Sequence, residues 1–209
     1  MIFKDRRDAG RQLASRLHHY KDKKDTLVIG LARGGVVTAH EIAQELHLPL
    51  GVIIVRKIGA PANEELALGA ITETGEGIFN EHLITLLGVS RDYLKKEVEK
   101  EKKIASARRA LYLQKSPPDL KDQTVLLVDD GIATGASMRV AVKSVKSQRA
   151  KRIVLAVPVA APDSLRLLEK EVDEVVCLYS PEHFEAVIAF YKSFDQTSDE
   201  EIVRILSSN

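Results

Sequence analysis

The feature that most constrains this chain is a repeated alternation between short apolar runs and segments with helical spacing. The runs are continuously apolar, which is the pattern of strands buried on both faces of a sheet. Strands that alternate with helices in this way are parallel and joined by right-handed crossovers. The sequence therefore predicts an α/β fold, a doubly wound, mainly parallel sheet with helices on both faces. Its core strands are expected at residues 26–31, 50–55, 125–128, 152–159 and 174–179.

Length, composition and charge exclude several functions. The 209 residues are 44% apolar, which suits one soluble α/β domain with a well-buried core. Lys and Arg number 31 against 30 Asp and Glu, and this balance gives no support for a nucleic-acid or membrane surface. The single Cys177 excludes an intrachain disulfide. The apolar runs are too short to span a bilayer and no signal peptide is evident, so we expect a cytoplasmic protein.

Residues 125–137 join a strand, an acidic pair and a glycine-containing loop. The apolar run ends at Asp129-Asp130, Gly131 and Gly135 follow, and Ser137 lies where the next helix should begin. Carboxylates can accept hydrogen bonds from sugar hydroxyls or hold a hydrated Mg²⁺. Unpaired N–H groups at a helix N-terminus favour a phosphate dianion. The segment predicts a sugar-phosphate site, although any α/β protein can place an Asp-Asp-Gly turn here.

Two other acidic or phosphate-binding motifs fit this segment less well. A Walker loop requires a Lys directly after its last glycine, and none follows Gly135. A response-regulator receiver carries its acidic pair after the first strand, whereas most of this chain precedes Asp129.

Two further loops lie where ligands bind in open α/β sheets. Residues 32–35, Ala-Arg-Gly-Gly, follow the first strand, where adjacent glycines let N–H groups converge on an anion and Arg33 can add a bidentate fork. Arg56 and Lys57 follow the second strand, at the carboxyl edge of the sheet. The alternatives are close helix packing at the glycines and a solvated basic turn. Residues 81–120 are charged and helical, and most of this segment is expected to be a solvated face.

Residues 125–137 resemble the phosphoribosyl-pyrophosphate (PRPP) signature of type I phosphoribosyltransferases. Arg33-Gly34-Gly35, the Arg56–Pro61 segment and Phe190-Tyr191-x-x-Phe194 fit small proteins of the same family over the whole length. The resemblance implies a single domain over 1–209, with a helical lid or hood insertion at about 73–120 that ends near Ser116-Pro117-Pro118. It also implies Mg²⁺ as cofactor and a homodimer.

The resemblance also implies roles for individual residues. Asp129, Asp130, Arg33 and Lys57 would be catalytic, with the two aspartates also serving the metal. The 5′-phosphate would be held by Gly131, Ile132, Ala133, Thr134, Gly135, Ala136 and Ser137. Pyrophosphate would be held by Ala32, Arg33, Gly34, Gly35, Arg56, Lys57, Arg108 and Arg109, and the acceptor by Phe184 and Val157.

The implied function is Mg²⁺-dependent transfer of phosphoribosyl from PRPP to an unidentified nitrogen acceptor, with release of pyrophosphate. The sequence departs from the purine enzymes, because their Ser-Tyr dipeptide is absent and the lid offers no evident proton donor or acceptor for a base. The alternative is a non-catalytic PRPP- or nucleotide-binding regulatory protein. A phosphatase would need a nucleophile, and none is evident.

Overall fold

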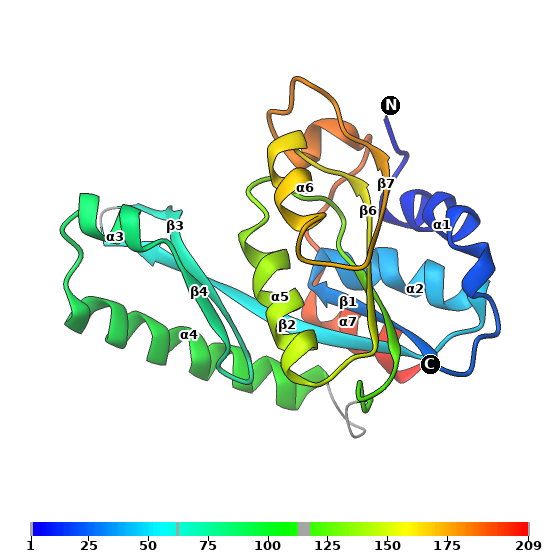
Figure 1. Cartoon of the computed structure of the whole chain (residues 1–209), viewed down its shortest axis with the longest axis horizontal. Helices are drawn as coiled ribbons and strands as arrows, with labels where there is room; N and C mark the ends of the chain where they lie inside the picture. The colour runs from blue at the N-terminus through cyan, green and yellow to red at the C-terminus, as the bar shows by residue number, and fades with distance from the viewer. Residues whose placement is uncertain (1, 62, 113–117, 209) are drawn as a thin grey trace.

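The computed structural model describes residues 2–61, 63–112 and 118–208 and is built on a seven-stranded sheet of order β4-β3-β2-β1-β5-β6-β7. Pairing from β2 through β1, β5 and β6 to β7 is parallel, whereas β2-β3 and β3-β4 pair antiparallel. The predicted fold class is confirmed (Figure 1). The strands are β1 (Thr26–Ala32), β2 (Leu50–Ala60), β3 (Asn63–Thr72), β4 (Gly77–Phe79), β5 (Thr124–Val128), β6 (Arg152–Val159) and β7 (Glu174–Tyr179).

Helices cover both faces of the parallel part of the sheet. One face packs on α1 and α2 and the other on α5 and α6, while α7 and the C-terminal end of α4 extend the first layer over β2. The α-helices are α1 (Arg6–Arg16), α2 (Gly34–Leu46), α3 (Glu81–Leu86), α4 (Arg91–Tyr112), α5 (Ala136–Ser147), α6 (Pro162–Leu168) and α7 (Asp199–Ser207). Within the described residues, no helix is both long and apolar enough to cross a membrane.

The register of β1 and β5 brings the two predicted ligand loops together. Gly30 pairs with Val128, so the loops that leave these strands begin side by side at the carboxyl edge of the sheet. Gly30 lets α2 pack closely, because a Cβ at this position would lie 2.8 Å from the Cα of Val36. The topology therefore places 32–35 next to 129–135.

Strand β2 is longer than the sequence predicted. Its parallel pairing with β1 ends at Ile54, but the strand continues to Ala60 by pairing antiparallel with β3. The hairpin supplies backbone partners beyond the edge of the parallel sheet, so Arg56 and Lys57 lie in a strand and not in a basic turn. This extension carries Lys57 past the end of β1.

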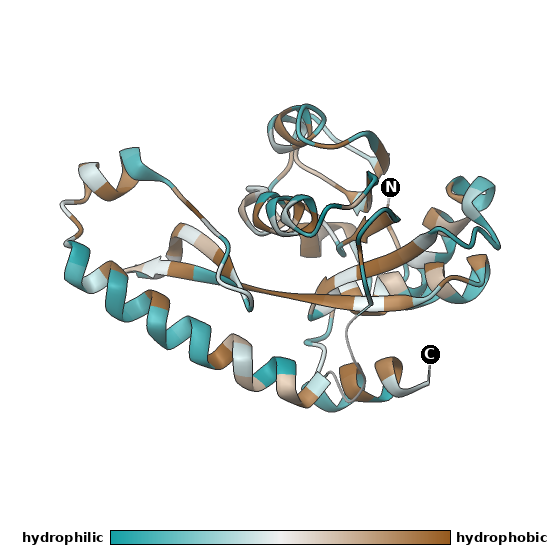
Figure 2. Ribbon diagram, turned by 60° about the horizontal axis from the view of Figure 1, so that its bottom comes forward, coloured by the Kyte–Doolittle hydropathy of each residue, from teal (hydrophilic) through white to brown (hydrophobic). Residues whose placement is uncertain are grey.

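Strands β3 and β4, helix α3 and the N-terminal half of α4 form a projection that we call the arm (residues 63–100) (Figure 1). The arm packs around its own apolar cluster, in which Leu68 and Ile84 contact Ile58 from the outer part of β2. Figure 2 shows β2 as an apolar ribbon that joins core and arm, and α4 as mainly hydrophilic. The insertion was predicted from about residue 73, whereas the arm already begins at β3. Ser116 and Pro117, predicted to end the insertion, lie outside the described residues.

Glu73 is a buried acid at the junction of arm and core. Its side chain is 8% exposed, its Oε2 accepts from the N–H of Ile54 (3.0 Å), and Arg109 lies 3.7 Å away. Burial raises the pKa of Glu73 above its ordinary value, because a low-dielectric site disfavours the charged form. Between the ordinary pKa and the raised one the folded chain binds more protons than the unfolded chain. Folding stability therefore falls as the pH rises through that window.

Glu73→Gln is expected to raise the melting temperature at pH 7, because the amide avoids the cost of a buried charge. The difference from the wild type should disappear at about pH 4, where the carboxyl is protonated in both states. Thermal melts at the two pH values test this. A lower melting temperature at pH 7 than the wild type would contradict it.

Glu76 provides a control, because its pKa is shifted in the opposite direction to that of Glu73. Burial alone would raise its pKa, but hydrogen bonds from Thr74, Thr72 and Ser147 outweigh burial and lower it. Ionised Glu76 thus stabilises the folded chain at pH values above its ordinary pKa. Glu76→Gln should lower the melting temperature at pH 7.

Candidate active site

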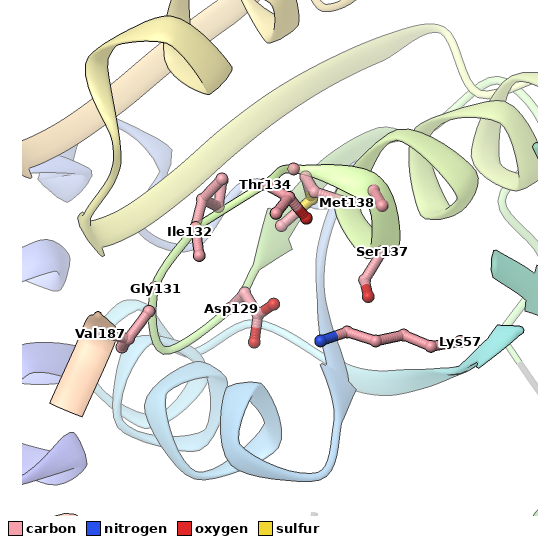
Figure 3. A pocket seen from close by; sticks show the side chains of 11 residues that line it. Lys57, Asp129, Gly131, Ile132, Thr134, Ser137, Met138 and Val187 are labelled. Atoms are coloured by element: carbon pink, nitrogen blue, oxygen red, sulfur yellow. The ribbon is translucent and has the colours of Figure 1, made fainter. Parts of the chain in front are cut away.

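A pocket of about 220 Å³ opens at the carboxyl end of β5, between the loop after that strand and the start of α5. Figure 3 shows Ser137 pointing into it and the ammonium group of Lys57 reaching across from β2 toward Asp129. Every residue of the predicted phosphate loop lines this pocket. The lining consists of Lys57, Asp129, Gly131, Ile132, Ala133, Thr134, Gly135, Ala136, Ser137, Met138 and Val187.

The phosphate loop is anchored at one end and leads into a helix at the other. The N–H of Ile132 donates to the Val159 carbonyl (2.9 Å), which fixes the loop on β6. Gly135 has a left-handed φ of +75° and precedes α5, whose first intrahelical bond runs from Arg139 N–H to the Gly135 carbonyl. The N–H groups of 136–138 come before that bond, where a helix attracts anions. The loop has the geometry of a phosphate site.

The acidic pair divides into two different environments. Asp129 lines the pocket and accepts a hydrogen bond from the N–H of Asp130 (2.9 Å). Asp130 does not line the pocket, and its Oδ2 lies 2.6 Å from Nε of Arg6. Burial and the neighbouring Asp130 raise the pKa of Asp129 well above its ordinary value. Burial also raises the pKa of Asp130, while Arg6 opposes the rise.

The glycine loop after β1 packs directly on this acidic pair. A Cβ on Gly34 would lie 2.0 Å from Oδ2 of Asp130, and one on Gly35 would lie 2.8 Å from Oδ1 of Asp129. The peptide bond that precedes Arg33 is cis. The structure thus brings the two predicted anion loops into contact, and the glycines are what allow this approach.

The predicted pyrophosphate-binding cations are only partly brought together. Lys57 lines the pocket and forms no ion pair within the described part of the chain. Arg33 and Arg108 each lie 3.8 Å from the same oxygen of Asp199, at the start of α7. Among the remaining arginines, Arg56 pairs with Glu101 at 2.5 Å and Arg109 faces Glu73. These four arginines therefore have carboxylate partners inside the protein.

The predicted acceptor residues belong to two different apolar clusters. Phe184 stacks on Phe190 with ring centroids 5.4 Å apart, in a segment whose only helix is a short 3₁₀ turn at Val187–Phe190. Val157 is fully buried in the core beneath α5 and α6, so its side chain faces core residues and not an acceptor.

Sequence reasoning missed several residues near the pocket. Val187 lines it, and its side chain occupies the space that a Cβ on Gly131 would enter. Arg6 comes from the first turn of α1, far from any recognised motif. An adjacent cleft of about 700 Å³ shares Lys57, Thr134 and Ala136 with the pocket and is lined on its other side by residues of the arm. No local sequence signal marks these residues, since the fold brings them together over long separations.

The donor set suits a metal that arrives with a substrate. In the described part of the chain, no three His, Cys, Asp or Glu side chains gather as a metal cage. Mg²⁺ is typically bound by one or two carboxylates together with substrate phosphates and water. Asp129 faces the pocket opposite the phosphate loop, so it can supply such a carboxylate.

Several known proteins are similar to this chain. The model of the phosphoribosyl transferase domain matches residues 3–194. A Mycobacterium tuberculosis protein with a provisional phosphoribosyl transferase name, Rv0571c, is 41% identical over 98% of this chain and 46% of its own length. The chain thus spans about half the length of the curated relative it matches. The uracil phosphoribosyltransferase of Lactococcus lactis is 31% identical over 65% of each chain.

A solved structure extends the similarity to the whole chain. The protein TT1426 from Thermus thermophilus is 40% identical, covers 100% of this chain and 99% of its own, and superposes with a TM-score of 0.82. Together with the domain match over 3–194, this similarity identifies the chain as a member of the phosphoribosyl transferase domain family.

Proposed function

We propose that this protein is a Mg²⁺-dependent phosphoribosyltransferase that transfers phosphoribosyl from PRPP to a nitrogen acceptor and releases pyrophosphate. The observation that carries the proposal is the convergence of the whole 131–137 loop, Asp129 and Lys57 on one pocket. In this pocket the N–H groups can bind a phosphate and the carboxylate can bind the hydroxyls of a sugar. The ammonium group can bind a second anion.

The residues act by position and charge and not by covalent chemistry. The backbone of 131–137, with the hydroxyls of Thr134 and Ser137, would hold the 5′-phosphate. Asp129 would accept from ribose hydroxyls and stabilise the positive charge that develops on the ring as the bond at C1 breaks. Lys57 and the Gly34-Gly35 backbone would face the departing pyrophosphate. Mg²⁺, when bound through Asp129 and the substrate, supplies additional positive charge to that leaving group.

The acceptor is proposed to be a nucleobase-like nitrogen heterocycle. Similarity to proteins named uracil phosphoribosyltransferases supports this class. Phe184 is half-buried in the apolar cluster that also contains Val187, a residue of the pocket lining, and it remains the proposed stacking residue. The homodimer remains a prediction that light scattering can check. The cytoplasmic location and a lid role for residues of about 73–120 also remain predictions.

Transfer is tested by following pyrophosphate release from PRPP and Mg²⁺ with a panel of nucleobases and amines. We expect release that requires one acceptor class and yields the matching ribonucleoside monophosphate. Release without any acceptor would indicate hydrolysis and would contradict transfer.

A regulatory protein that binds PRPP or a nucleotide without turnover is the second candidate. It is favoured by the contacts of Arg33 and Arg108 with Asp199, which keep two predicted pyrophosphate ligands on an internal carboxylate. Tight binding of PRPP with no product from any acceptor would support this candidate over the transferase.

A further inference from the structure

Arg6 is a largely buried cation that belongs to none of the recognised motifs and contacts Asp130, the neighbour of the pocket residue Asp129. Its side chain is 12% exposed, and Nε donates to Oδ2 of Asp130 at 2.6 Å. Nη1 donates to the Asp195 carbonyl (2.7 Å), and the guanidinium carbon lies 3.7 Å from the centre of the Phe194 ring. Two edges and one face of the guanidinium are thus fixed by two segments, the loop after β5 and residues 194–195, which favours a single orientation.

The same group lies against the predicted pyrophosphate loop. A Cβ added to Gly34 would fall 2.8 Å from Nε of Arg6 and 2.0 Å from Oδ2 of Asp130. The ion pair therefore occupies the space left by the missing side chain of this glycine. On the other side, the hydroxyl of Tyr191 donates to the Asp130 carbonyl at 2.6 Å, so both the side chain and the backbone of Asp130 are restrained.

From these contacts we infer that Arg6 is a positioning residue that divides the acidic pair, holding Asp130 back beside Gly34 so that Asp129 alone faces the ligand. The inference rests on the proposed function of the pocket. Asp129 and Asp130 are adjacent and carry like charges, and without a cation both would compete for the same solvent-facing space. Arg6 gives Asp130 a partner away from the pocket.

A purely structural role for Arg6, as a tie that holds the C-terminal segment on α1, is the alternative. A tie would need only the contacts of Arg6 with Asp195 and Phe194, which hold the C-terminal segment on α1. The inference requires in addition that the effect of Arg6 on ligand binding pass through Asp130. A double-mutant cycle separates these possibilities, because residues that act through one another are not additive.

The test is titration of PRPP with Mg²⁺ into the wild type, Arg6→Gln, Asp130→Asn and the double variant, with melting curves to confirm folding. Arg6→Gln should weaken binding by about 10–100-fold, the effect of removing partners that orient a ligand-binding group. In the Asp130→Asn background the same change should cost less than about twofold. Arg11→Gln is the matched control, because Arg11 lies on the same helix as Arg6 and its exposed side chain pairs with Glu41 of α2. This variant should bind PRPP as the wild type does.

Several outcomes would overturn the inference. Folded Arg6→Gln that binds as tightly as the wild type would do so. An equal loss in the Asp130→Asn background would also overturn it, because Arg6 would then act through the C-terminal segment or by direct contact with the ligand. Should Arg6→Gln not fold, Arg6→Lys replaces it in the same cycle, since it keeps the charge but lacks the planar fork. Absence of PRPP binding by the wild type would overturn the proposed function and this inference together.

Discussion

Asp129→Asn is expected to weaken binding of PRPP with Mg²⁺ by about 100-fold, or about 3 kcal/mol. Asp129 is the carboxylate of the acidic pair that lines the pocket, opposite Lys57 (Figure 3). The amide keeps the size of the side chain and can still accept from the N–H of Asp130. It cannot supply the negative charge that a metal and a cationic transition state require. Titration calorimetry of the variant and the wild type measures the loss.

The same substitution should not destabilise the folded protein. Burial and Asp130 raise the pKa of Asp129, so its ionised form costs stability at neutral pH. Asp129→Asn removes that cost, and its melting temperature at pH 7 is expected to equal or exceed that of the wild type. Weaker binding with unchanged or higher stability would identify a functional group held at the expense of stability. Binding as tight as that of the wild type would show that Asp129 is not a ligand-binding group.

Gly35→Ala is expected to weaken PRPP binding by at least about tenfold and to destabilise folding by about 1–3 kcal/mol. The added Cβ would lie 2.9 Å from both the Cα of Asp129 and the carbonyl oxygen of Val128. These are backbone atoms at the end of a buried strand and cannot rotate away. The methyl group should therefore push the glycine loop and the acidic loop apart.

Calorimetry and urea unfolding measure the two effects of Gly35→Ala. Gly77→Ala is the control, because Gly77 lies in the arm and its nearest neighbour would be a ring carbon of Phe79 at 3.0 Å. That ring can adjust, so PRPP binding should remain within about twofold of the wild type. Binding by Gly35→Ala at wild-type strength would contradict the proposed contact of the two loops.

The sequence predicted those parts of the fold and site in which local pattern decides structure. Continuous apolar runs located the parallel strands, and the 125–137 segment located the pocket, because a strand, an acidic pair and a glycine loop form a contiguous unit. The predicted end of β2, at residue 55, was five residues too early. The continuation of the strand to Ala60 depends on pairing with β3 and not on the strand's own composition.

The roles of single charges could not be read from the sequence in the same way. Arg6 and Asp130 are 124 residues apart, and only the packing of α1 beside the end of β5 brings them together. The sequence therefore predicted the same catalytic and metal-binding role for Asp129 and Asp130. Arg33 and Arg108 were predicted to face pyrophosphate, but the start of α7 presents Asp199 to both. Long-range ion pairs of this kind have no local signature.

The most direct test of the account is calorimetric titration of PRPP into the wild-type protein with and without Mg²⁺. We expect saturable binding of one PRPP per chain that is markedly tighter with Mg²⁺, because Asp129 would hold the metal together with the substrate. Binding of equal strength in both conditions would contradict the role of the carboxylate. No binding in either condition would contradict the assignment of the 129–137 pocket as a PRPP site.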